Sequence, residues 1–552
     1  MDNWKIIFEK WVPEEQPLRE ALCTLGNGYF ATRGAMAECG AGGVHYPGTY
    51  LAGGYNRLKS EVSGQIMENE DLVNWPNWLS LTFRHEGETE WFTIEKVEVI
   101  HYRLVLNMEE GVLIRHLRFR DKQKRETSLT TRRFVSMAQK HLAALQLELT
   151  PENWSGKIEV CSAIDGGVTN SGVPRYRKLA GQHLQVLQTG ENEEQDTVFM
   201  EVETVQSKVR VAQAVRTSVL TEIPSCELKR ELKQKENYVA HVLTVACEQQ
   251  RPVHVEKVLA LFASRDKAIT EPVLEAQKAV ARVSSFAEIL NEHRRVWRQL
   301  WERSDLKVAC NDRTHQILRL HIFHLLQTAS MHTGEADAGV PARGWHGEAY
   351  RGHIFWDELF IFPFLNLRLP ELTRQLLMYR YRRLTEARFA AREAGYRGAM
   401  FPWQSGSNGR EESQIIHLNP KSGRWLPDNT FLQRHINAAV AYNVWHYYQA
   451  THDREFLIYY GAELIFEIAQ FWSTIAIFSQ EKGRYEIRNV VGPDEYHTSY
   501  PGSESPGLNN NAYTNVMAVW VIQCALQVMQ LLDRSRVNEL KDKCAITTDD
   551  VE

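Results

Sequence analysis

Apolar and polar residues alternate through the first half of the chain. Every second residue is apolar in residues 79–83 and 145–149, and a polar HEGE turn separates the first of these runs from the strand-like residues 91–94. Residues 253–262 form another apolar stretch of strand length. Many short strands separated by polar turns are typical of a large antiparallel β-sandwich. We therefore predict a sandwich domain over residues 1–265.

The period of the pattern then changes. Apolar residues follow helical spacing through residues 272–302, so residues 266–305 are predicted to be a helical linker. Further helical patterns are predicted over residues 317–326, 372–391, 431–448, 456–477 and 512–532. Strands followed by a run of helices indicate two separate domains. The loops between these helices are long, which favours a toroid of paired helices over residues 306–552 rather than a short-looped bundle.

Charge and composition narrow the class of protein. The 552 residues include 64 Lys and Arg against 69 Asp and Glu, a net charge of −5. This balance argues against nucleic acid or an anionic membrane as the main partner. No run approaches the ~18–20 apolar residues of a membrane span, and no signal peptide is visible, so a cytoplasmic location is expected. Eight cysteines without a C-x-x-C motif indicate neither a disulfide framework nor a zinc site.

Three loops concentrate the residue types that bind sugars. The chain contains 15 Trp, 20 Tyr and 21 Phe, and aromatic faces stack on sugar rings as well as filling cores. The loops combine Trp with Arg, Asp and Asn, which hold hydroxyl groups. They are residues 343–357 (RGWHGEAYRGHIFWD), 398–406 (GAMFPWQSG), and 491–497 (VGPDEYH) followed by 509–515 (NNNAYTN).

These loops resemble the signature segments of glycoside hydrolase family 65, which includes maltose, trehalose and kojibiose phosphorylases and acid trehalases. Residues 25–34 (LGNGYFATRG) and 47–50 (PGTY) resemble the family's opening motif. The resemblance implies an N-terminal β-sandwich, a helical linker and an (α/α)6 barrel. It also implies a homodimer, which the sequence does not support independently.

The resemblance assigns roles residue by residue. Glu495 matches the family's general acid, which should lie in a partly desolvated pocket that raises its pKa. Arg351 and Asp357 match positions that hold hydroxyls of the non-reducing glucose, and Trp356 and Trp403 would line that subsite. Asn510, Asn511 and Tyr513, which follow the acid, are expected to orient its loop.

Three features depart from the family pattern. Gln404 stands where many family phosphorylases have Glu, so it keeps hydrogen-bonding capacity without the charge, and Glu358 follows Asp357 one residue earlier than the family's F-W-D-T-E run places its Glu. Nothing after Glu495 matches the family's Lys-Gln pair, its Ser/Thr/His phosphate cluster or the second carboxylate of its hydrolases. We therefore expect the barrel to be incomplete in this chain.

The resulting hypothesis is an inverting α-glucoside phosphorylase that takes a small-molecule α-glucoside and inorganic phosphate as substrates. An inverting hydrolase, which needs a second carboxylate about 6.5–9.5 Å away, is one alternative. An inactive fragment with a sugar-binding surface is the other. The sequence shows no dinucleotide motif, P-loop or metal-ligand spacing, so neither a cofactor nor a metal is expected.

Overall fold

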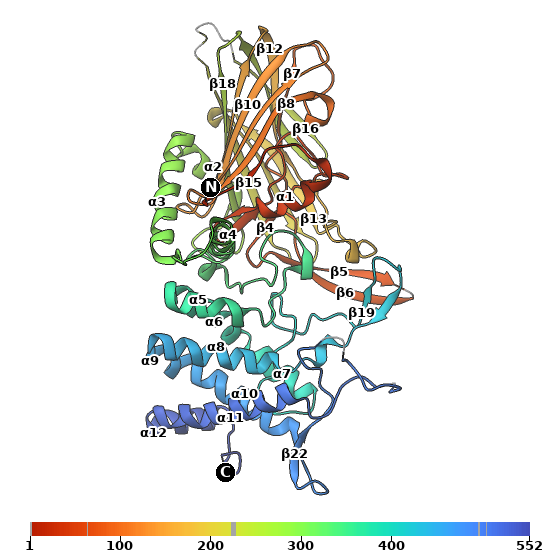
Figure 1. Cartoon of the computed structure of the whole chain (residues 1–552), viewed down its shortest axis with the longest axis vertical. Helices are drawn as coiled ribbons and strands as arrows, with labels where there is room; N and C mark the ends of the chain where they lie inside the picture. Colours follow the sequence, from red (N-terminus) through yellow and green to blue (C-terminus); the bar gives the residue numbers. More distant parts are fainter. Residues whose placement is uncertain are drawn as a thin grey trace.

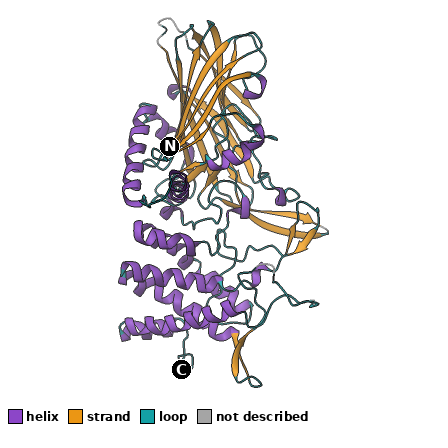
Figure 2. Cartoon of the chain, in the orientation of Figure 1, coloured by secondary structure: helices purple, strands orange, loops and turns teal. Residues whose placement is uncertain are grey.

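A computed structural model describes residues 3–62, 64–221, 223, 228–494, 497–503 and 505–551. The chain forms a β-rich N-terminal domain followed by a helical domain, stacked along the long axis of the molecule (Figure 1, Figure 2). The strands of the N-terminal domain are β1 Lys5–Phe8, β2 Leu25–Gly26, β3 Phe30–Thr32, β4 Thr49–Leu51, β5 Tyr55–Val62, β6 Gln65–Leu72, β7 Leu81–His85, β8 Glu98–Asn107, β9 Val112–Arg120, β10 Glu126–Val135, β11 Leu142–Pro151, β12 Gly156–Asp165, β13 Leu184–Asn192, β14 Thr197–Thr204, β15 Arg210–Thr221, β16 Lys229–Lys235, β17 Tyr238–Cys247 and β18 Val253–Ala263.

Two antiparallel sheets build the N-terminal domain. Nine strands pair in the order β1-β8-β9-β10-β11-β18-β15-β14-β13, and four pair in the order β16-β17-β12-β7. The Lys257 ammonium of β18 crosses between the sheets to donate to the Ser80 and Ala163 carbonyls, at 2.7 and 2.8 Å. Burial lowers the pKa of Lys257 to about 7. The arrangement is a β-sandwich, but residues 91–94, predicted as a strand, run into a short 3₁₀ turn at Ile94–Lys96.

Two helices cover the outer face of the nine-stranded sheet. Helices α2 (Pro272–Ala281) and α3 (Phe286–Ser304) occupy the segment where the sequence predicts a helical linker. Val280 and Phe286 are buried against small residues of β15 and β18, such as Ala260. Small side chains on the strands let the helices approach closely, so the sheet buries the apolar face of these helices.

The helical domain follows the linker. Its elements are α4 Asp312–Thr328, α5 Glu358–Arg368, α6 Pro370–Arg382, α7 Leu384–Glu393, α8 Ile436–Thr451, α9 Arg454–Phe456, α10 Ala462–Ile475, α11 Ala512–Leu531 and α12 Arg534–Lys543, with the short hairpins β19 Ile416–Leu418 with β20 Trp425–Pro427 and β21 Ala476–Ser479 with β22 Arg484–Ile487; short α1 Gln16–Leu22 lies in the N-terminal domain. The helix predicted over residues 372–391 is two helices. They part at Arg383, whose guanidinium donates to the carbonyls of Ser407 and Tyr379.

Helix α11 is apolar on more than its buried face. Among the described residues it alone has the length and composition of a membrane span, with a mean hydropathy of 1.3, and 33% of that window is buried. A core helix of a globular protein passes the same test, and α11 packs on α10 and α8. Val516 and Val519 point outward, at 66% and 55% exposure. Gln523, Gln527 and Gln530 interrupt its apolar residues, so the helix does not contain the uninterrupted apolar run that the sequence analysis looked for.

The opening motif joins the two domains. The Gly28 amide donates to the Gln327 carbonyl of α4 at 2.8 Å, and the Ser330 hydroxyl donates to the Asn27 carbonyl. Gly28 has φ +83°, and a Cβ there would fall 2.2 Å from the Ser330 hydroxyl oxygen. Only glycine suits this close approach. The motif thus places the helical domain against the sandwich.

Candidate active site

A short backbone bridge brings two of the predicted loops together. Ile354 and Ser405 exchange two main-chain hydrogen bonds, at 2.9 and 3.0 Å. The Glu411 carboxylate holds the second loop by accepting from the amides of Trp403 and Gln404, at 2.8 and 3.2 Å. As a result two segments about fifty residues apart in sequence present their aromatic side chains to each other.

Trp356 is the centre of an aromatic cluster. Its ring centroid lies 5.9 Å from that of Trp403, 4.8 Å from His435 and 6.2 Å from Tyr513. Trp403 is buried, whereas Trp356 is only partly buried. Tyr513 comes from the first turn of α11, capped by the Asn511 side chain on the Thr514 amide. The structure therefore gathers three residues that the sequence analysis placed in separate motifs, and a partly open indole face suits stacking on a sugar ring.

His435 is a member of this cluster that no motif indicated. It lies at the start of α8 and is fully buried between Trp356, Trp403 and Tyr513. Within the described part of the chain, neither ring nitrogen has a hydrogen-bond partner of good geometry. Burial lowers the pKa of His435 to about 4, with the nearby Val491 main chain acting the other way. A neutral, unpartnered imidazole is a ready partner for a hydroxyl group.

Asp357 stands at the N-cap of α5, next to Trp356. Burial raises the pKa of its carboxyl group, and the Arg343 charge opposes that effect. No ion pair to Asp357 occurs among the residues that the structure describes. The neighbouring Glu358 forms a buried ion pair with Arg380 through Oε2, at 3.1 Å, while its Oε1 has no hydrogen-bond partner of good geometry among the described residues. Asp357 therefore has no cation partner among the described residues, and its contact with a sugar hydroxyl stays a prediction.

Arg351 occupies a different environment from Trp356. It is 3% exposed and forms an ion pair with Asp71 of β6, and its guanidinium carbon lies 4.1 Å from the Tyr176 ring. Asp71 and Tyr176 both belong to the N-terminal domain. Arg351 therefore links the helical domain to the N-terminal domain. Its contact with glucose hydroxyls stays a prediction.

The backbone at Arg351 is strained. Tyr350 and Arg351 have φ values of +53° and +57°, so two consecutive residues with side chains adopt the left-handed conformation. The Tyr55 hydroxyl donates to the Gly352 carbonyl at 2.5 Å, and the Arg351–Asp71 ion pair holds the same turn. Strain held by contacts from another domain is typical of turns that position functional residues. Here it sets the direction from which the chain enters residues 353–357.

Gln404 faces a buried histidine. Its side-chain amide lies 3.1 Å from Nδ1 of His353, and His353 Nε2 lies 2.9 Å from the Glu70 carbonyl. Burial lowers the pKa of His353, so the ring is neutral. A neutral amide beside a neutral imidazole avoids the buried charge that Glu would bring. The departure at Gln404 therefore matches its surroundings.

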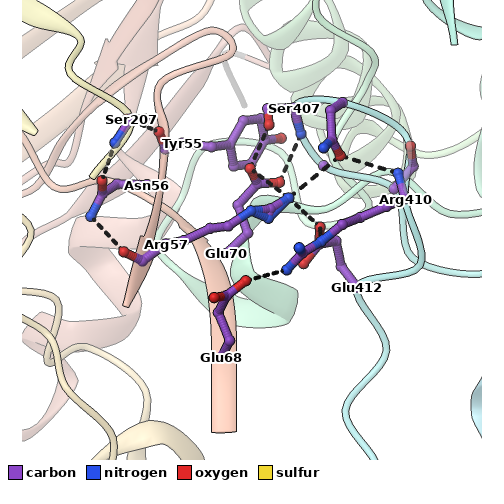
Figure 3. Close-up of polar contacts among 12 residues, drawn as sticks. Tyr55, Asn56, Arg57, Glu68, Glu70, Ser207, Ser407, Arg410 and Glu412 are labelled. Carbon is purple, nitrogen blue, oxygen red and sulfur yellow. Dashed lines mark hydrogen bonds and ion pairs between the residues drawn. The ribbon is translucent and has the colours of Figure 1, made fainter. Parts of the chain in front are cut away.

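A charged network anchors the Trp403 loop to the sandwich domain (Figure 3). Arg57 of β5 lies 3.2 Å from Glu70 of β6 and 2.5 Å from Glu412, and Arg410 lies 2.9 Å from Glu412. The Ser407 amide and hydroxyl both donate to the Glu70 carboxylate. Burial and the Glu70 charge raise the pKa of Glu412 to about 7, against the two arginines. The β5–β6 hairpin thus fixes the loop that carries Trp403 and Gln404.

Glu495, the predicted general acid, lies outside the described residues. The chain before it is tied to the cluster, because the Val491 amide donates to the Leu432 carbonyl at 3.0 Å, three residues before His435. Val490 and Leu508 exchange main-chain hydrogen bonds. Asp494 and His497 form an exposed pair at 2.6 Å. The described flanks of the Glu495 segment therefore start from the same loops that carry His435 and Tyr513.

Neither a metal-ligand cluster nor a large cavity identifies this region among the described residues. Across the described ranges, no three His, Cys, Asp or Glu side chains gather as metal ligands. A cavity of about 360 Å³ lies in the sandwich domain beside Trp91 and Phe119, and none of the predicted site residues lines it. The candidate site is defined instead by the aromatic cluster and its loops.

The fold and these loops define a protein of a glycoside-processing family, and family comparison agrees. Residues 6–300 match the model described as glycosyl hydrolase family 65, N-terminal domain, and residues 319–552 match that of the family's central catalytic domain. The chain belongs to glycosyl hydrolase family 65.

Several proteins are similar to this chain. An uncharacterized glycosyl hydrolase of Mycobacterium tuberculosis is 47% identical over 548 residues, covering 99% of this chain and 41% of the relative. A trehalose 6-phosphate phosphorylase of Lactococcus lactis is 35% identical, covering 94% and 65%, and a kojibiose phosphorylase of Halothermothrix orenii is 32% identical, covering 100% and 68%. The chain therefore spans between about two fifths and two thirds of these relatives.

One solved structure shares the fold. It comes from the human microbiome, is named as a candidate kojibiose phosphorylase, and superposes with a TM-score of 0.83 at 21% identity. The match covers 100% of this chain and 68% of that one. At this identity the likeness concerns the fold alone.

Proposed function

We propose that the chain is an inverting α-glucoside phosphorylase that binds glucose at the aromatic cluster described above. The observation that carries the proposal is the cluster of Trp356, Trp403, His435 and Tyr513 beside the unpaired Asp357. Aromatic faces and a free carboxylate together bind a pyranose ring by its C–H face and its hydroxyls. The named phosphorylases among the relatives support this choice of reaction.

In the proposed reaction Glu495 protonates the oxygen that links the two sugars. Inorganic phosphate attacks the anomeric carbon from the opposite face, the glycosidic C–O bond breaks, and the proton leaves with the released sugar or polyol. The other product is β-glucose 1-phosphate. Phosphate is already an anionic nucleophile, so one catalytic carboxylate suffices, whereas water attack needs a second one.

For the helical domain we propose the (α/α)6 barrel of the family. The exposed apolar face of α11, with Val516 and Val519, supports a barrel in which further helices pack on it. Such a face gains about 25 cal/mol for each Å² removed from water. A homodimer, a cytoplasmic location, and the absence of a metal or organic cofactor stay predictions from the sequence.

The test measures loss of kojibiose or α,α-trehalose by the purified chain with and without inorganic phosphate. The proposal expects turnover only with phosphate, and Glu495→Gln lowers it by about 10²–10⁴-fold. Glu236→Gln, an exposed carboxylate in the sandwich domain, is the matched control and keeps full turnover.

Each of three other outcomes would overturn the proposal, and each would favour a different conclusion. Equal turnover without phosphate establishes a hydrolase. Sugar binding without turnover under either condition establishes the sugar-binding fragment. No effect of Glu495→Gln on phosphate-dependent turnover removes that residue from the acid role.

A further inference from the structure

The cavity of about 360 Å³ in the sandwich domain lies between strand β7 and the turn that follows β9. The chain between β7 and β8, including the strand-like segment at residues 91–93, supplies much of its lining. None of the described residues that line it belongs to the helical domain, and Figure 1 shows β7 in the part of the sandwich away from helices α5 to α11. The cavity is therefore separate from the aromatic cluster. Its volume falls in the range of about 300–1,000 Å³ that is typical of ligand pockets.

Three phenylalanine rings form an apolar part of the lining. The Phe92 ring centroid lies 4.9 Å from that of Phe83, with the ring planes 18° apart, and 4.7 Å from that of Phe119. Phe83 and Phe119 are buried, whereas Phe92 is only partly buried. The two buried rings therefore hold Phe92 in place while part of its ring stays accessible.

The segment that carries Phe92 is fixed beside β7. The Phe92 amide donates to the Phe83 carbonyl at 2.8 Å, and the Thr82 hydroxyl donates to the Phe92 carbonyl at 2.9 Å. The Arg84 guanidinium carbon lies 4.3 Å from the centroid of the Trp91 ring. Aromatic side chains on a fixed segment lose little freedom when they bind a ligand.

Ion pairs join the two turns that border the cavity. Glu88, in the turn after β7, lies 2.5 Å from Arg125, and Arg125 lies 2.6 Å from Asp121, in the turn after β9. The Asp121 carboxylate also accepts from the amides of Gln123 and Arg125, both at 2.9 Å. These contacts hold the two turns, and with them the shape of the cavity, in place.

The cavity lining carries no net charge. Its charged side chains are three cations and three carboxylates: Arg84, Lys96, Lys122, Glu88, Glu90 and Asp121. Burial lowers the pKa of His85, which also lines the cavity, so its ring is neutral at pH 7. A lining with balanced charges attracts neither anions nor cations over distance. It therefore favours a neutral ligand.

One hydroxyl group of the lining lacks a partner. The side-chain oxygen of Thr93 is buried, and among the described residues it has no hydrogen-bond partner of good geometry. Most buried polar side-chain atoms in native proteins have a partner, so an exception calls for an explanation. A hydroxyl group of a bound ligand supplies the missing partner.

We propose that this cavity is a second saccharide site, which binds one or two rings of a neutral sugar. The C–H face of a pyranose ring packs on Phe92, and its hydroxyl groups bond to Thr93 and to polar groups such as Asp121 and Gln123. The site lies outside the candidate active site. It therefore goes beyond the proposed function and does not depend on it.

The test is calorimetric titration of the purified chain with glucose, maltose and sorbitol, an acyclic polyol with as many carbons as glucose. The chain carries Trp356→Ala, so that the aromatic cluster does not contribute, and the chain with native Trp356 is titrated alongside. We expect glucose and maltose to bind the variant, and sorbitol to bind at least about fivefold more weakly because it has no ring face. The chain with native Trp356 should bind maltose at two sites.

Two further substitutions assign the binding to the cavity. Thr93→Val keeps the shape of the side chain but removes the hydroxyl, and should weaken maltose binding about fivefold without lowering stability in urea. Phe92→Leu keeps an apolar side chain but removes the ring face, and should weaken maltose binding by about threefold to tenfold. Thr150→Val, at a sandwich threonine outside the cavity lining, is the matched control and leaves the affinity unchanged.

Three results overturn the assignment. If the Trp356→Ala chain keeps a native urea midpoint but binds no maltose, the sandwich holds no saccharide site. If neither Thr93→Val nor Phe92→Leu weakens the binding, the sugar lies outside this cavity. Equal affinity for glucose and sorbitol removes the sugar ring from recognition. Since no step requires turnover or phosphate, these outcomes are independent of the phosphate-dependence test of the proposed function.

Discussion

Arg351 and Asp71 form a buried ion pair between residues 280 positions apart in the sequence, one in the helical domain and one in the sandwich. The pair explains how the strained turn at Tyr350 and Arg351 is held in the loop that leads to the aromatic cluster. It also links the position of the 353–357 loop to the β6 strand. The position of one site loop therefore depends on the packing of both domains.

Removing one member of this pair should destabilise the chain. Arg351→Met leaves the Asp71 carboxylate buried without its cation, and we expect a loss of about 3–5 kcal/mol in the free energy of unfolding. Urea denaturation measures it. Arg351→Lys, which keeps the charge, should recover part of the loss. If Arg351→Met instead keeps full stability and only raises the KM for the glucoside, its predicted role at the substrate is the correct one.

Substitution of His435 is predicted to lower the affinity for the glucoside without lowering the stability of the folded chain. His435→Phe keeps a ring among Trp356, Trp403 and Tyr513 but removes both nitrogens. We expect glucoside affinity to fall about tenfold, as for loss of a good hydrogen bond, while stability stays equal or rises by about 1 kcal/mol. Binding titration and urea denaturation test the two effects. Unchanged affinity would assign the imidazole to packing alone.

Gln404 allows a test of the neutral pair with His353. Gln404→Glu places a carboxylate beside the imidazole and should raise the pKa of His353, which burial now lowers. In the native chain a lowered pKa means that stability is lost as pH falls below the usual histidine value, when the unfolded chain takes up the proton. The variant should lose less stability over that acid range. Histidine NMR titration follows the pKa, and an unchanged value contradicts the pairing.

Because the pKa of the Glu412 carboxyl is shifted, we predict that the stability of the folded chain depends on pH at the domain junction. Its pKa is about 7, above its usual 4.5, so the folded chain binds this proton more tightly than the unfolded chain does. The resulting stability is present below about pH 4.5 and is lost as pH rises through about 7, by about 3 kcal/mol in all. Glu412→Gln cannot titrate and should flatten this part of the stability profile. The measurement compares the urea denaturation midpoints of the native chain and the Glu412→Gln variant at pH 5 and pH 8. Parallel stability profiles for the two proteins would refute the shifted pKa of Glu412.

Much of the fold could be predicted because the local spacing of apolar residues distinguishes strands from helices. Alternation over residues 145–149 and 253–262 corresponds to β11 and β18, and the helical spacing of residues 512–532 corresponds to α11. Such periodicity depends only on which side chains each segment must bury. Trp356 and Trp403 were instead assigned to the candidate site by the resemblance of their loops to family motifs.

What the sequence by itself determined about this protein is its family, its broad order of strands and helices, and the loops that carry the candidate site residues. Only the tertiary structure decided that Arg351 is joined to Asp71 and that His435 completes the aromatic cluster. These relationships link residues far apart in the chain. They depend on how the sandwich packs against the helices, and no local periodicity encodes that packing.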